Sequence, residues 1–402
     1  MVRPERRTRG DLTAVVAIVL VVLVGAGVIW WNSDARATVS QPAGQAIRPA
    51  PAPAGVPAEL GEVWRAPSPA TPEPVVAGPA AVTAGDGEVR GRNPVTGKVR
   101  WRFARDLPLC TVGAEWGRAI AVYRKWHNCS GVTSLKGATG EFGPQRNGST
   151  PFGTRLLSDG DYVTATGRQL FGTWRSDLVR TQQYGIPVDL KNPDNNMARP
   201  ECEYASIAVG RGRVGVVEEC PKAPSDRITV LKAHPESSEE PEQVFTSLLG
   251  SSRASVVAVS RTHVAVVLHD RSELVVHGFR DNERSTHRLR IPEPGPPQAN
   301  VRVESTTKAN RIYWHTGTDT VALDSRTLTP LWTIPDTLGA GTIFADKLVV
   351  PVRGGLAVHD PNTGERLRVL PVDRHDYRGE VVLDSVGDVL LEQRGDTLVA
   401  LR

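Results

Sequence analysis

Several residue classes are scarce in this 402-residue chain, and each shortage excludes a class of protein. Phe, Trp and Tyr make up only 5% of the residues, which argues against a large cofactor cavity lined by aromatic rings. The formal net charge is +4, and about half of this surplus lies in the N-terminal arginine-rich segment. The rest of the chain therefore lacks the dense basic surface that phosphate backbones require, and nucleic acid is not an expected partner.

The motifs of common enzyme classes are absent as well. The sequence contains no HExxH, no Gly-x-Ser-x-Gly elbow and no phosphate-binding loop. No CxxC occurs, and none of the nine histidines lies at metal-ligand spacing from a cysteine. These absences predict a protein that is not an enzyme and that holds neither a metal ion nor another cofactor.

The longest uncharged segment lies near the N-terminus. Four arginines precede Leu12–Trp31, which carries no charge. As a helix this segment spans about 30 Å, the thickness of the hydrocarbon core of a bilayer. The arginines predict a cytoplasmic N-terminus. We therefore expect residues 1–11 in the cytoplasm, a signal-anchor helix over 12–31 in the cell membrane, and the remainder on the extracytoplasmic side.

A cleaved signal peptide is the alternative, because Asp34–Thr38 reads DARAT and offers a small-x-small cleavage site. The apolar segment exceeds the roughly 7–15 residues of a signal core, which favours the anchor. Residues 32–58 are rich in Pro, Ala and Gly. Such a segment cannot bury enough apolar surface to fold, and we expect an extended spacer that holds the folded part away from the membrane.

From residue 59 onward the chain consists of short apolar or alternating runs broken by turn residues, which is typical of many short strands. Runs of the form apolar-x-apolar-x-turn recur about every 44 residues, the period of a four-stranded propeller blade. They begin at Val89, Val132, Leu170, Ile228, Leu274, Val321, Leu356 and Leu398. The sequence therefore predicts an all-β, eight-bladed β-propeller over residues 59–402. Seven blades are the alternative, because the units at Gln169 and Ile228 lack a Thr-Gly turn.

Three of the units share a Thr-Gly pair, within Asn93–Lys98, Gly137–Glu141 and Pro361–Glu365. Glycine tolerates the positive φ angle that such hairpin turns need. Trp101 and Trp332 begin the strand after the turn of their own units, where a large ring would fit between neighbouring blades.

The C-terminal segment DTLVALR ends one strand short of a complete blade. A candidate for the missing strand lies near the other end of the chain, because Gly61–Pro67 (GEVWRAP) resembles the strands that follow the turns of other units. Pairing of this segment with the C-terminal strand would close the ring and remove the exposed sheet edges of an open array.

The repeated pattern of an apolar run, Asp, Thr-Gly and Trp resembles the PQQ-type β-propeller repeat. The resemblance extends over roughly Gly61–Arg402, and three or four units carry it clearly. Gly172–Gly185, together with the anchor and spacer, is similar to membrane-anchored actinobacterial propellers of unassigned function. Quinoprotein dehydrogenases of this fold are much longer and carry adjacent cysteines, which this chain lacks. The resemblance therefore implies the scaffold without the quinone cofactor.

The four cysteines form two pairs with nearly equal spacing. Each pair is expected to flank a hairpin of the first and second strands of a blade, which places the two sulfurs opposite one another. In an oxidising compartment we expect two disulfides, Cys110–Cys129 and Cys202–Cys220. Metal binding is the alternative, but the spacing of metal ligands is absent.

The longest interval between repeats precedes Ile228 and contains Trp174–Cys202. Long loops on a rigid scaffold commonly carry binding residues. Within this interval, KNPDNN (191–196) offers hydrogen-bond acceptors. The candidate binding residues combine planar hydrogen-bonding groups with an aromatic ring: Arg175, Asp177, Arg180, Gln183 and Tyr184. The alternative is that Arg175 and Asp177 form a salt bridge between blades and that the rest is solvated loop.

Together these features predict a membrane-tethered, non-enzymatic binding or scaffold module of the cell envelope. Its partner would be an envelope protein or a wall polymer. Two alternatives use the central channel of the propeller. One is an enzyme with polar residues converging from several blades, for which Tyr313–Asp319 (YWHTGTD) is a candidate lining. The other is a small-ligand sensor, although the short cytoplasmic segment leaves little room for an output domain.

Overall fold

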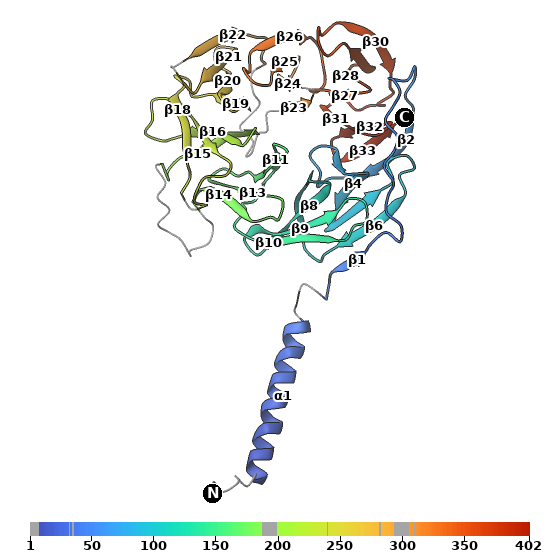
Figure 1. The fold of residues 1–402 in the computed structure, drawn as a ribbon, viewed down its shortest axis with the longest axis vertical. Helices are drawn as coiled ribbons and strands as arrows, with labels where there is room; N and C mark the ends of the chain where they lie inside the picture. Colours follow the sequence, from blue (N-terminus) through green and yellow to red (C-terminus); the bar gives the residue numbers. More distant parts are fainter. Residues whose placement is uncertain are drawn as a thin grey trace.

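A computed structural model describes residues 8–31, 33, 36–186, 199–238, 240–280, 283–292, 305–308 and 310–402, with 305–308 described by their backbone only. The described residues form one N-terminal helix and eight antiparallel sheets arranged in a ring (Figure 1). Seven of these sheets have four strands and one has five. The predicted all-β propeller with eight blades is therefore confirmed, and the seven-bladed alternative is wrong.

In each of the first seven blades, four strands follow one another along the chain. Blade 1 comprises β3 (Val75–Ala77), β4 (Ala80–Gly85), β5 (Glu88–Arg92) and β6 (Val99–Ala104). Blade 2 comprises β7 (Leu109–Glu115), β8 (Arg118–Lys125), β9 (Asn128–Lys136) and β10 (Phe142–Asn147). Blade 3 comprises β11 (Leu156–Ser158), β12 (Val163–Ala165), β13 (Leu170–Trp174) and β14 (Arg180–Gly185). Blade 4 comprises β15 (Glu203–Gly210), β16 (Arg213–Glu219), β17 (Arg227–Lys232) and β18 (Gln243–Leu248).

The second half of the ring follows the same plan. Blade 5 comprises β19 (Ala254–Val259), β20 (His263–Leu268), β21 (Glu273–Gly278) and β22 (Arg284–Arg288). Blade 6 comprises β23 (Ser305–Lys308), β24 (Arg311–His315), β25 (Thr320–Asp324) and β26 (Pro330–Ile334). Blade 7 comprises β27 (Thr342–Phe344), β28 (Lys347–Val352), β29 (Gly355–His359) and β30 (Arg366–Pro371).

Blade 8 closes the ring with strands from both ends of the propeller. It combines β31 (Val381–Val386), β32 (Val389–Arg394) and β33 (Thr397–Leu401) with β2 (Glu62–Pro67). β2 lies antiparallel to β33, with Glu62 opposite Leu401 and Pro67 opposite Thr397. The predicted closure is therefore confirmed, and it pairs the outer edge of β33 that would otherwise be exposed.

The alternating direction of the strands gives the ring two distinct faces. Turns between first and second strands and between third and fourth strands lie on one face, which we call the tip face; the turns at Arg211 and Arg326 belong to it. Turns between second and third strands, together with the links between blades, lie on the opposite face, which we call the linker face. The hydrophobic core lies between neighbouring blades, as where Val217 and Ile228 of blade 4 meet Val256 and Val264 of blade 5.

The helix α1 spans Arg9–Trp31 and lies outside the ring (Figure 1). It begins three residues before the predicted start, because Thr8 and Asp11 cap its first turn: the Thr8 amide donates to Asp11 Oδ2 at 2.7 Å, and the Asp11 amide donates to Thr8 Oγ1 at 3.3 Å. None of its residues is buried. By length and composition α1 is able to cross a membrane.

The Pro/Ala-rich segment differs from the predicted extended spacer, because part of it packs on the propeller. β1 (Val39–Gln41) pairs with the outer edge of β6 and makes the fifth strand of blade 1. Beyond it, the amides of Ala43 and Ile47 donate to carbonyls of the β9–β10 turn at 2.8 and 2.9 Å. The segment cannot fold alone, but an exposed strand edge offers it backbone partners and a hydrophobic contact for Ile47.

The same segment then continues over the tip face. Ala50 lies against Gly387 in the β31–β32 turn of blade 8. Arg368 of blade 7 donates to the backbone carbonyls of Val56 and Pro57, the latter at 2.8 Å. Residues 39–57, which we call the strap, therefore contact blades 1, 2, 8 and 7.

Tryptophan rings join neighbouring blades, as the sequence predicts for Trp101 and Trp332. Trp101 is 1% exposed, and its ring packs on Gly140 in the Thr-Gly turn of the next blade. A Cβ atom at Gly140 would lie 2.5 Å from the ring, and Gly140 has φ +73°. Trp64 and Trp332 pack on the corresponding glycines of blades 1 and 7. Each indole Nε1 donates to a carbonyl of the same turn: Trp101 to Gly137 at 2.8 Å, Trp64 to Pro94 at 2.7 Å and Trp332 to Asn362 at 3.2 Å.

Arginines in the links between blades bind acids of the blade that follows. In each of three pairs, the arginine lies in the link before a blade and the acid belongs to that blade. The pairs at blades 4, 6 and 8 are Arg199 with Glu218, Arg290 with Asp319, and Arg374 with Glu392. Glu218 and Glu392 are completely buried. A buried carboxylate is tolerated only with a paired cation and full hydrogen bonding, so these pairs hold each link in one position.

Candidate binding face and central channel

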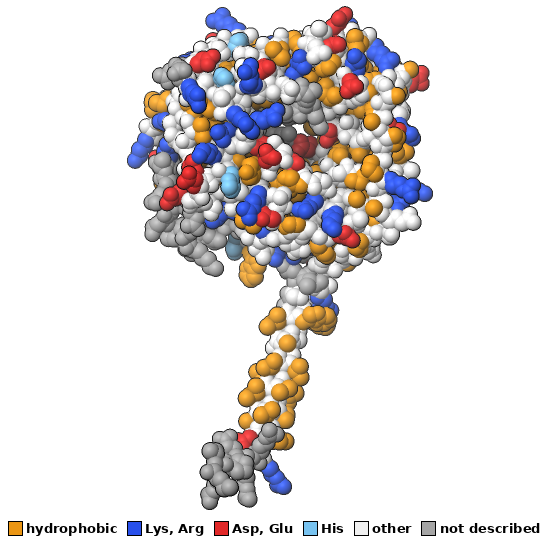
Figure 2. Space-filling view, viewed as in Figure 1, with side chains coloured by type: hydrophobic (Ala, Val, Ile, Leu, Met, Phe, Trp, Pro, Cys, Tyr) orange, Lys and Arg blue, Asp and Glu red, His pale blue; other side chains and the backbone are white. Residues whose placement is uncertain are grey.

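The central channel has a volume of about 700 Å³. Its wall is made mainly of backbone and apolar side chains from the first strands of the blades, including β3, β11, β15 and β19. The charged residues of its lining are Glu73, Glu115, Asp159, Arg211 and Asp384. Figure 2 shows acidic side chains at the opening and a group of basic side chains beside it.

Two of the four acidic side chains that line the channel connect neighbouring hairpin tips. Glu115 of blade 2 accepts a hydrogen bond from the Ser158 hydroxyl of blade 3. Asp159 Oδ2 accepts from the Gly212 amide of blade 4 at 2.7 Å. These two carboxylates therefore serve the architecture of the ring, and they are already engaged as hydrogen-bond acceptors.

The channel does not fit the quinone cofactor of the family that the repeats resemble. Its lining contains no tryptophan to stack on a quinone and no cysteine among the described residues. Across the described part of the chain, no group of three or more His, Cys, Asp or Glu residues is arranged to hold a metal ion. No step of a quinone reaction is therefore assigned to this channel.

The YWHTGTD segment does not contribute its histidine to the channel lining. His315 lies at the linker-face end of β24, where Nδ1 is 3.2 Å from Glu380 Oε1 and Nε2 is 3.3 Å from the Thr337 carbonyl oxygen. Asp319 accepts from Arg290 Nε at 2.9 Å. Both side chains thus join the links between blades, as expected of a strand-end turn.

The structure separates the five predicted loop residues. Arg175 and Asp177 are exposed in the β13–β14 turn on the tip face, where Arg175 Nε is 2.9 Å from both carboxylate oxygens of Asp177. This ion pair lies within one turn, so the predicted alternative of a bridge between blades is wrong. Arg180 donates to Gln183 on β14. KNPDNN (191–196) lies outside the described residues.

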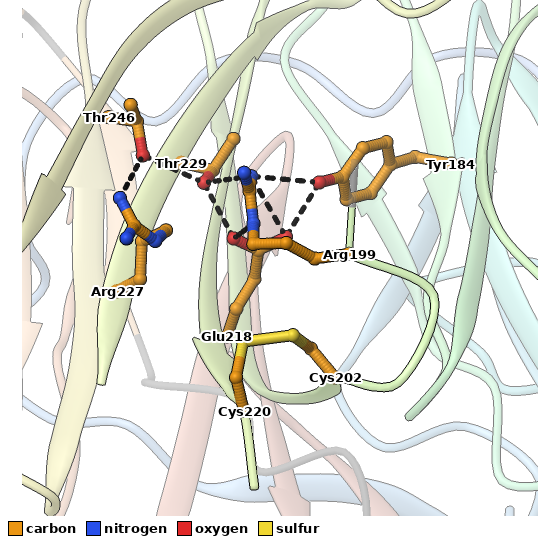
Figure 3. The surroundings of a disulfide bond; sticks show 8 residues. All are labelled: Tyr184, Arg199, Cys202, Glu218, Cys220, Arg227, Thr229 and Thr246. Atoms are coloured by element: carbon orange, nitrogen blue, oxygen red, sulfur yellow. Dashed lines mark hydrogen bonds and ion pairs between the residues drawn. A yellow bond between two sulfur atoms is a disulfide. The ribbon is translucent and has the colours of Figure 1, made fainter. Parts of the chain in front are cut away.

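Tyr184 lies at the far end of β14 and is buried (Figure 3). Its hydroxyl donates to Glu218 Oε1 at 2.6 Å, and Thr229 Oγ1 donates to Glu218 Oε2 at 2.7 Å. Arg199 Nε donates to Glu218 Oε2 at 2.9 Å. Burial, followed by the negative charge of Glu218, raises the pKa of the Tyr184 hydroxyl. Tyr184 is therefore a protonated donor in a network that joins blades 3 and 4, and it is not a surface binding residue.

Both predicted disulfides are present, Cys110–Cys129 and Cys202–Cys220. Cys202 and Cys220 flank the β15–β16 hairpin as predicted, directly beside the Glu218 network (Figure 3). Cys110 and Cys129 instead join the first and third strands of blade 2, so the predicted hairpin geometry is wrong for this pair. Each bond closes a loop of fewer than 20 residues, worth about 3 kcal/mol in the chain-entropy description.

A groove of about 420 Å³ lies beside the channel mouth on the tip face. It is lined by residues from the turns of blades 4, 5 and 6: Arg211, Ser260, Arg261, Asn310, Asp324, Ser325 and Arg326. The sequence prediction did not include these residues. Each arginine lies in a different hairpin turn, and their proximity depends on which turns share a face. The pattern in the sequence that could have indicated this groove is the presence of one arginine in a turn of each of three successive blades.

Titratable groups with strongly shifted pKa values lie away from the channel lining. Burial, followed by the negative charges of Glu219 and Asp270, raises the pKa of Asp226 to about 6. Burial, followed by the positive charge of Arg284, lowers the pKa of His277 to about 4. Burial also lowers the pKa values of two further histidines, His269 and His359.

These shifts make opposite contributions to stability in mildly acidic solution. Because the pKa of Asp226 is raised, this carboxyl group binds a proton more tightly in the folded protein than in the unfolded chain. Protonated Asp226 therefore contributes to the free energy of unfolding at low pH, and this contribution is lost as the pH rises from about 4 to about 6. The unfolded state binds protons more tightly at the three histidines, so their contribution to stability increases as the pH rises toward 6.5.

Asp226→Asn should therefore make stability increase more steeply with pH than in the wild type between about pH 4 and 6. The asparagine carbonyl is still able to accept the hydrogen bond that the Ala254 amide donates to Asp226 Oδ2 at 3.0 Å. Urea unfolding of both proteins across this pH range measures the two slopes. Parallel curves would show that Asp226 ionises normally in the folded protein.

No protein-family model matches the chain, and none of the curated proteins matches its sequence. Solved structures do share its architecture. BamB from Moraxella catarrhalis is 15% identical with a TM-score of 0.52, and the match covers 85% of this chain and 99% of that one. Sqt1 from Saccharomyces cerevisiae is 11% identical with a TM-score of 0.52, covering 86% of this chain and 98% of that one. At these identities the likeness shows the fold alone, and that fold is the β-propeller.

Proposed function

We propose that this chain is a membrane-tethered β-propeller that acts outside the cytoplasm as a non-enzymatic binding or scaffold module of the cell envelope. The observation that carries this proposal is the role of two acidic side chains at the channel mouth. Glu115 and Asp159 accept hydrogen bonds that join hairpin tips of neighbouring blades, to Ser158 and Gly212. Carboxylates committed to such bonds support a rigid surface for recognition rather than acid–base chemistry.

The proposed location is supported by helix α1, by the strap that follows it and by the two disulfides. Helix α1 would be an uncleaved anchor with a cytoplasmic N-terminus, and the strap would hold the propeller close to it. Two disulfides suit an oxidising compartment. Tryptophans packed on the Thr-Gly turns of the next blade support assignment to the PQQ-like repeat proteins, with neither quinone nor metal as a cofactor. The partner would be an envelope protein or a wall polymer.

In-cell photo-cross-linking from defined surfaces tests this function. A benzophenone amino acid replaces Arg175 on the tip face, His375 on the linker face or Val369 on the outer edge of blade 7, all of which are exposed. We expect one adduct of defined mass from one face and none from Val369. Failure to form an adduct from either face, with the folded protein present at normal abundance, would reject the scaffold function.

The alternative functions would place a small ligand in the channel. Its volume of about 700 Å³ lies within the range of small-molecule sites. Ala208→Trp fills the channel from β15 without changing either face. A cellular defect caused by this substitution, in a protein that still forms its normal adduct, would favour an enzyme or a sensor.

A further inference from the structure

The groove beside the channel mouth holds three arginines that are exposed to solvent, Arg211, Arg261 and Arg326. Within the described part of the chain, none of the three guanidinium groups forms a hydrogen bond or an ion pair with another side chain. Most arginines elsewhere on the propeller are engaged, as Arg175 is with Asp177. The groove therefore concentrates positive charge, which Asp324 of the same groove offsets only in part.

The backbone holds Arg211 in a conformation that favours glycine. Arg211 lies between two glycines at the β15–β16 turn and has φ +51°. A side chain in this left-handed region costs on the order of 1 kcal/mol or more, and such positions often mark functional sites. A glycine at this position would carry no such strain. The sequence nevertheless has an arginine here, and this arginine lines the groove.

One carboxylate belongs to the groove, and it is largely committed to its own turn. Asp324 Oδ1 accepts from the amides of Arg326 and Thr327 at 2.9 and 2.8 Å, and from Thr327 Oγ1 at 3.1 Å. With three arginines and one aspartate, the lining has a net charge of +2. Burial, followed by the positive charge of Arg261, lowers the pKa of the neighbouring Arg213. The lining of the groove itself therefore carries a surplus of positive charge.

The groove lies on the part of the tip face that the strap leaves open. The strap contacts the turns of blades 2 and 8 through Ile47 and Ala50. The groove residues belong to blades 4, 5 and 6, across the central opening. Figure 2 shows basic side chains gathered beside this opening, on the side of β19 and β23. A ligand in solution is thus able to reach them.

The chemistry of the lining selects among anions. Guanidinium groups bind phosphate oxygens through paired, charge-assisted hydrogen bonds. The remaining described residues of the lining, Ser260, Asn310 and Ser325, are all polar, and no apolar side chain is present to receive a peptide side chain. Asp324 and Asn310 also line the groove, and a carboxylate and an amide are both able to bind hydroxyl groups. This combination favours a phosphate ester on a polyol or sugar over an acidic peptide.

We propose that this groove binds the phosphate ester of a polyol or sugar, with the phosphate held by Arg211, Arg261 and Arg326 and hydroxyl groups held by Asp324 and Asn310. The proposal rests on the proposed function as an extracytoplasmic binding module and gives that module a ligand class. A phosphate-bearing polymer of the envelope presents this chemistry many times along one chain, so weak single contacts would add up to firm attachment.

Calorimetric titration of the full-length chain in phosphatidylcholine nanodiscs tests the proposal with glycerol 3-phosphate, inorganic phosphate and glycerol as probes. We expect glycerol 3-phosphate to bind more tightly than inorganic phosphate and glycerol not to bind. Replacing Arg211, Arg261 and Arg326 together with serine should weaken binding at least tenfold. The matched control replaces three exposed arginines of blade 5 with serine, which changes the net charge equally and should leave affinity unchanged: Arg280, Arg284 and Arg288.

Each other outcome overturns a defined part of the proposal. Unchanged binding by the groove variant would remove the site, and equal affinities for glycerol 3-phosphate and phosphate would remove the polyol. A loss of affinity when the discs contain phosphatidylglycerol would assign the groove to lipid headgroups. Absence of phosphate binding, combined with an adduct from the tip face in cells, would overturn this inference and leave the scaffold function intact.

Discussion

Replacing Glu392 with alanine is expected to lower the free energy of unfolding by about 3–5 kcal/mol. Glu392 is completely buried and holds two arginines, each with a side chain only 5% exposed. Arg374 donates to Oε1 at 2.7 Å and to Oε2 at 3.0 Å, and Arg394 donates to Oε2 at 2.7 Å. Alanine would leave two buried cations without their counter-charge. Urea unfolding of the full-length chain in detergent micelles measures the loss.

Glu141→Ala is the matched control for this prediction. Glu141 pairs with Lys136 at 2.9 Å, but both side chains are more than half exposed. An exposed ion pair contributes little, so this variant should leave the free energy of unfolding almost unchanged. Equal losses in the two variants would mean that Glu392 is not a buried anchor. Because Arg374 also donates to the Val352 and Gly355 carbonyls, the damage should extend to the contact between blades 7 and 8.

Trp101→Ala is expected to cost about 3–5 kcal/mol, the usual cost of removing a buried aromatic ring. The ring is 1% exposed and fills the space between blades 1 and 2, against Gly140. Its loss also leaves the Gly137 carbonyl without the indole donor at 2.8 Å. Trp126→Ala provides the control, because Trp126 is 89% exposed and its removal should change stability by less than about 0.5 kcal/mol. The unfolding transition is followed by far-ultraviolet circular dichroism, which does not depend on the removed ring.

A second substitution tests whether the ring and the Thr-Gly turn act together. Gly140→Ala places a Cβ atom 2.5 Å from the Trp101 ring and puts alanine at φ +73°. When Gly140→Ala is made in the wild-type background, both the clash with the ring and the backbone strain destabilise the fold. When it is made in the Trp101→Ala background, only the backbone strain remains. The cost of Gly140→Ala should therefore be smaller in the Trp101→Ala background. Additive costs would show that the turn does not receive the ring.

Features that depend on neighbouring residues could be predicted well from the sequence. The Thr-Gly pairs require positive φ, and Gly97, Gly140 and Gly364 adopt it at +68°, +73° and +74°. The alternating runs between turns predicted the blades because a strand with buried faces has a regular pattern of apolar residues. The disulfide partners followed from equal spacing, although Cys129 lies on the third strand of its blade rather than the second.

Features that depend on contacts between distant segments could not be predicted. Nothing in the composition of the strap indicates that Val39–Gln41 would pair with β6, because backbone pairing at an open edge requires no particular side chain. Tyr184 looked like a binding residue beside Arg175, but its partner Glu218 lies on another blade. The arginine groove was missed for the same reason, since its residues come from three blades.

The pairing of β2 with β33 has a consequence for how the protein is made. Apart from β1, β2 precedes all other strands of the blades along the chain, whereas its partner β33 follows all of them. During synthesis β2 therefore has no partner until β33 has been made, by which time the strands of the first seven blades are already complete. A chain that stops before β33 keeps open sheet edges at β2 and β32. Incomplete products thus expose strand edges that are able to pair with other chains, whereas the complete propeller has these edges paired.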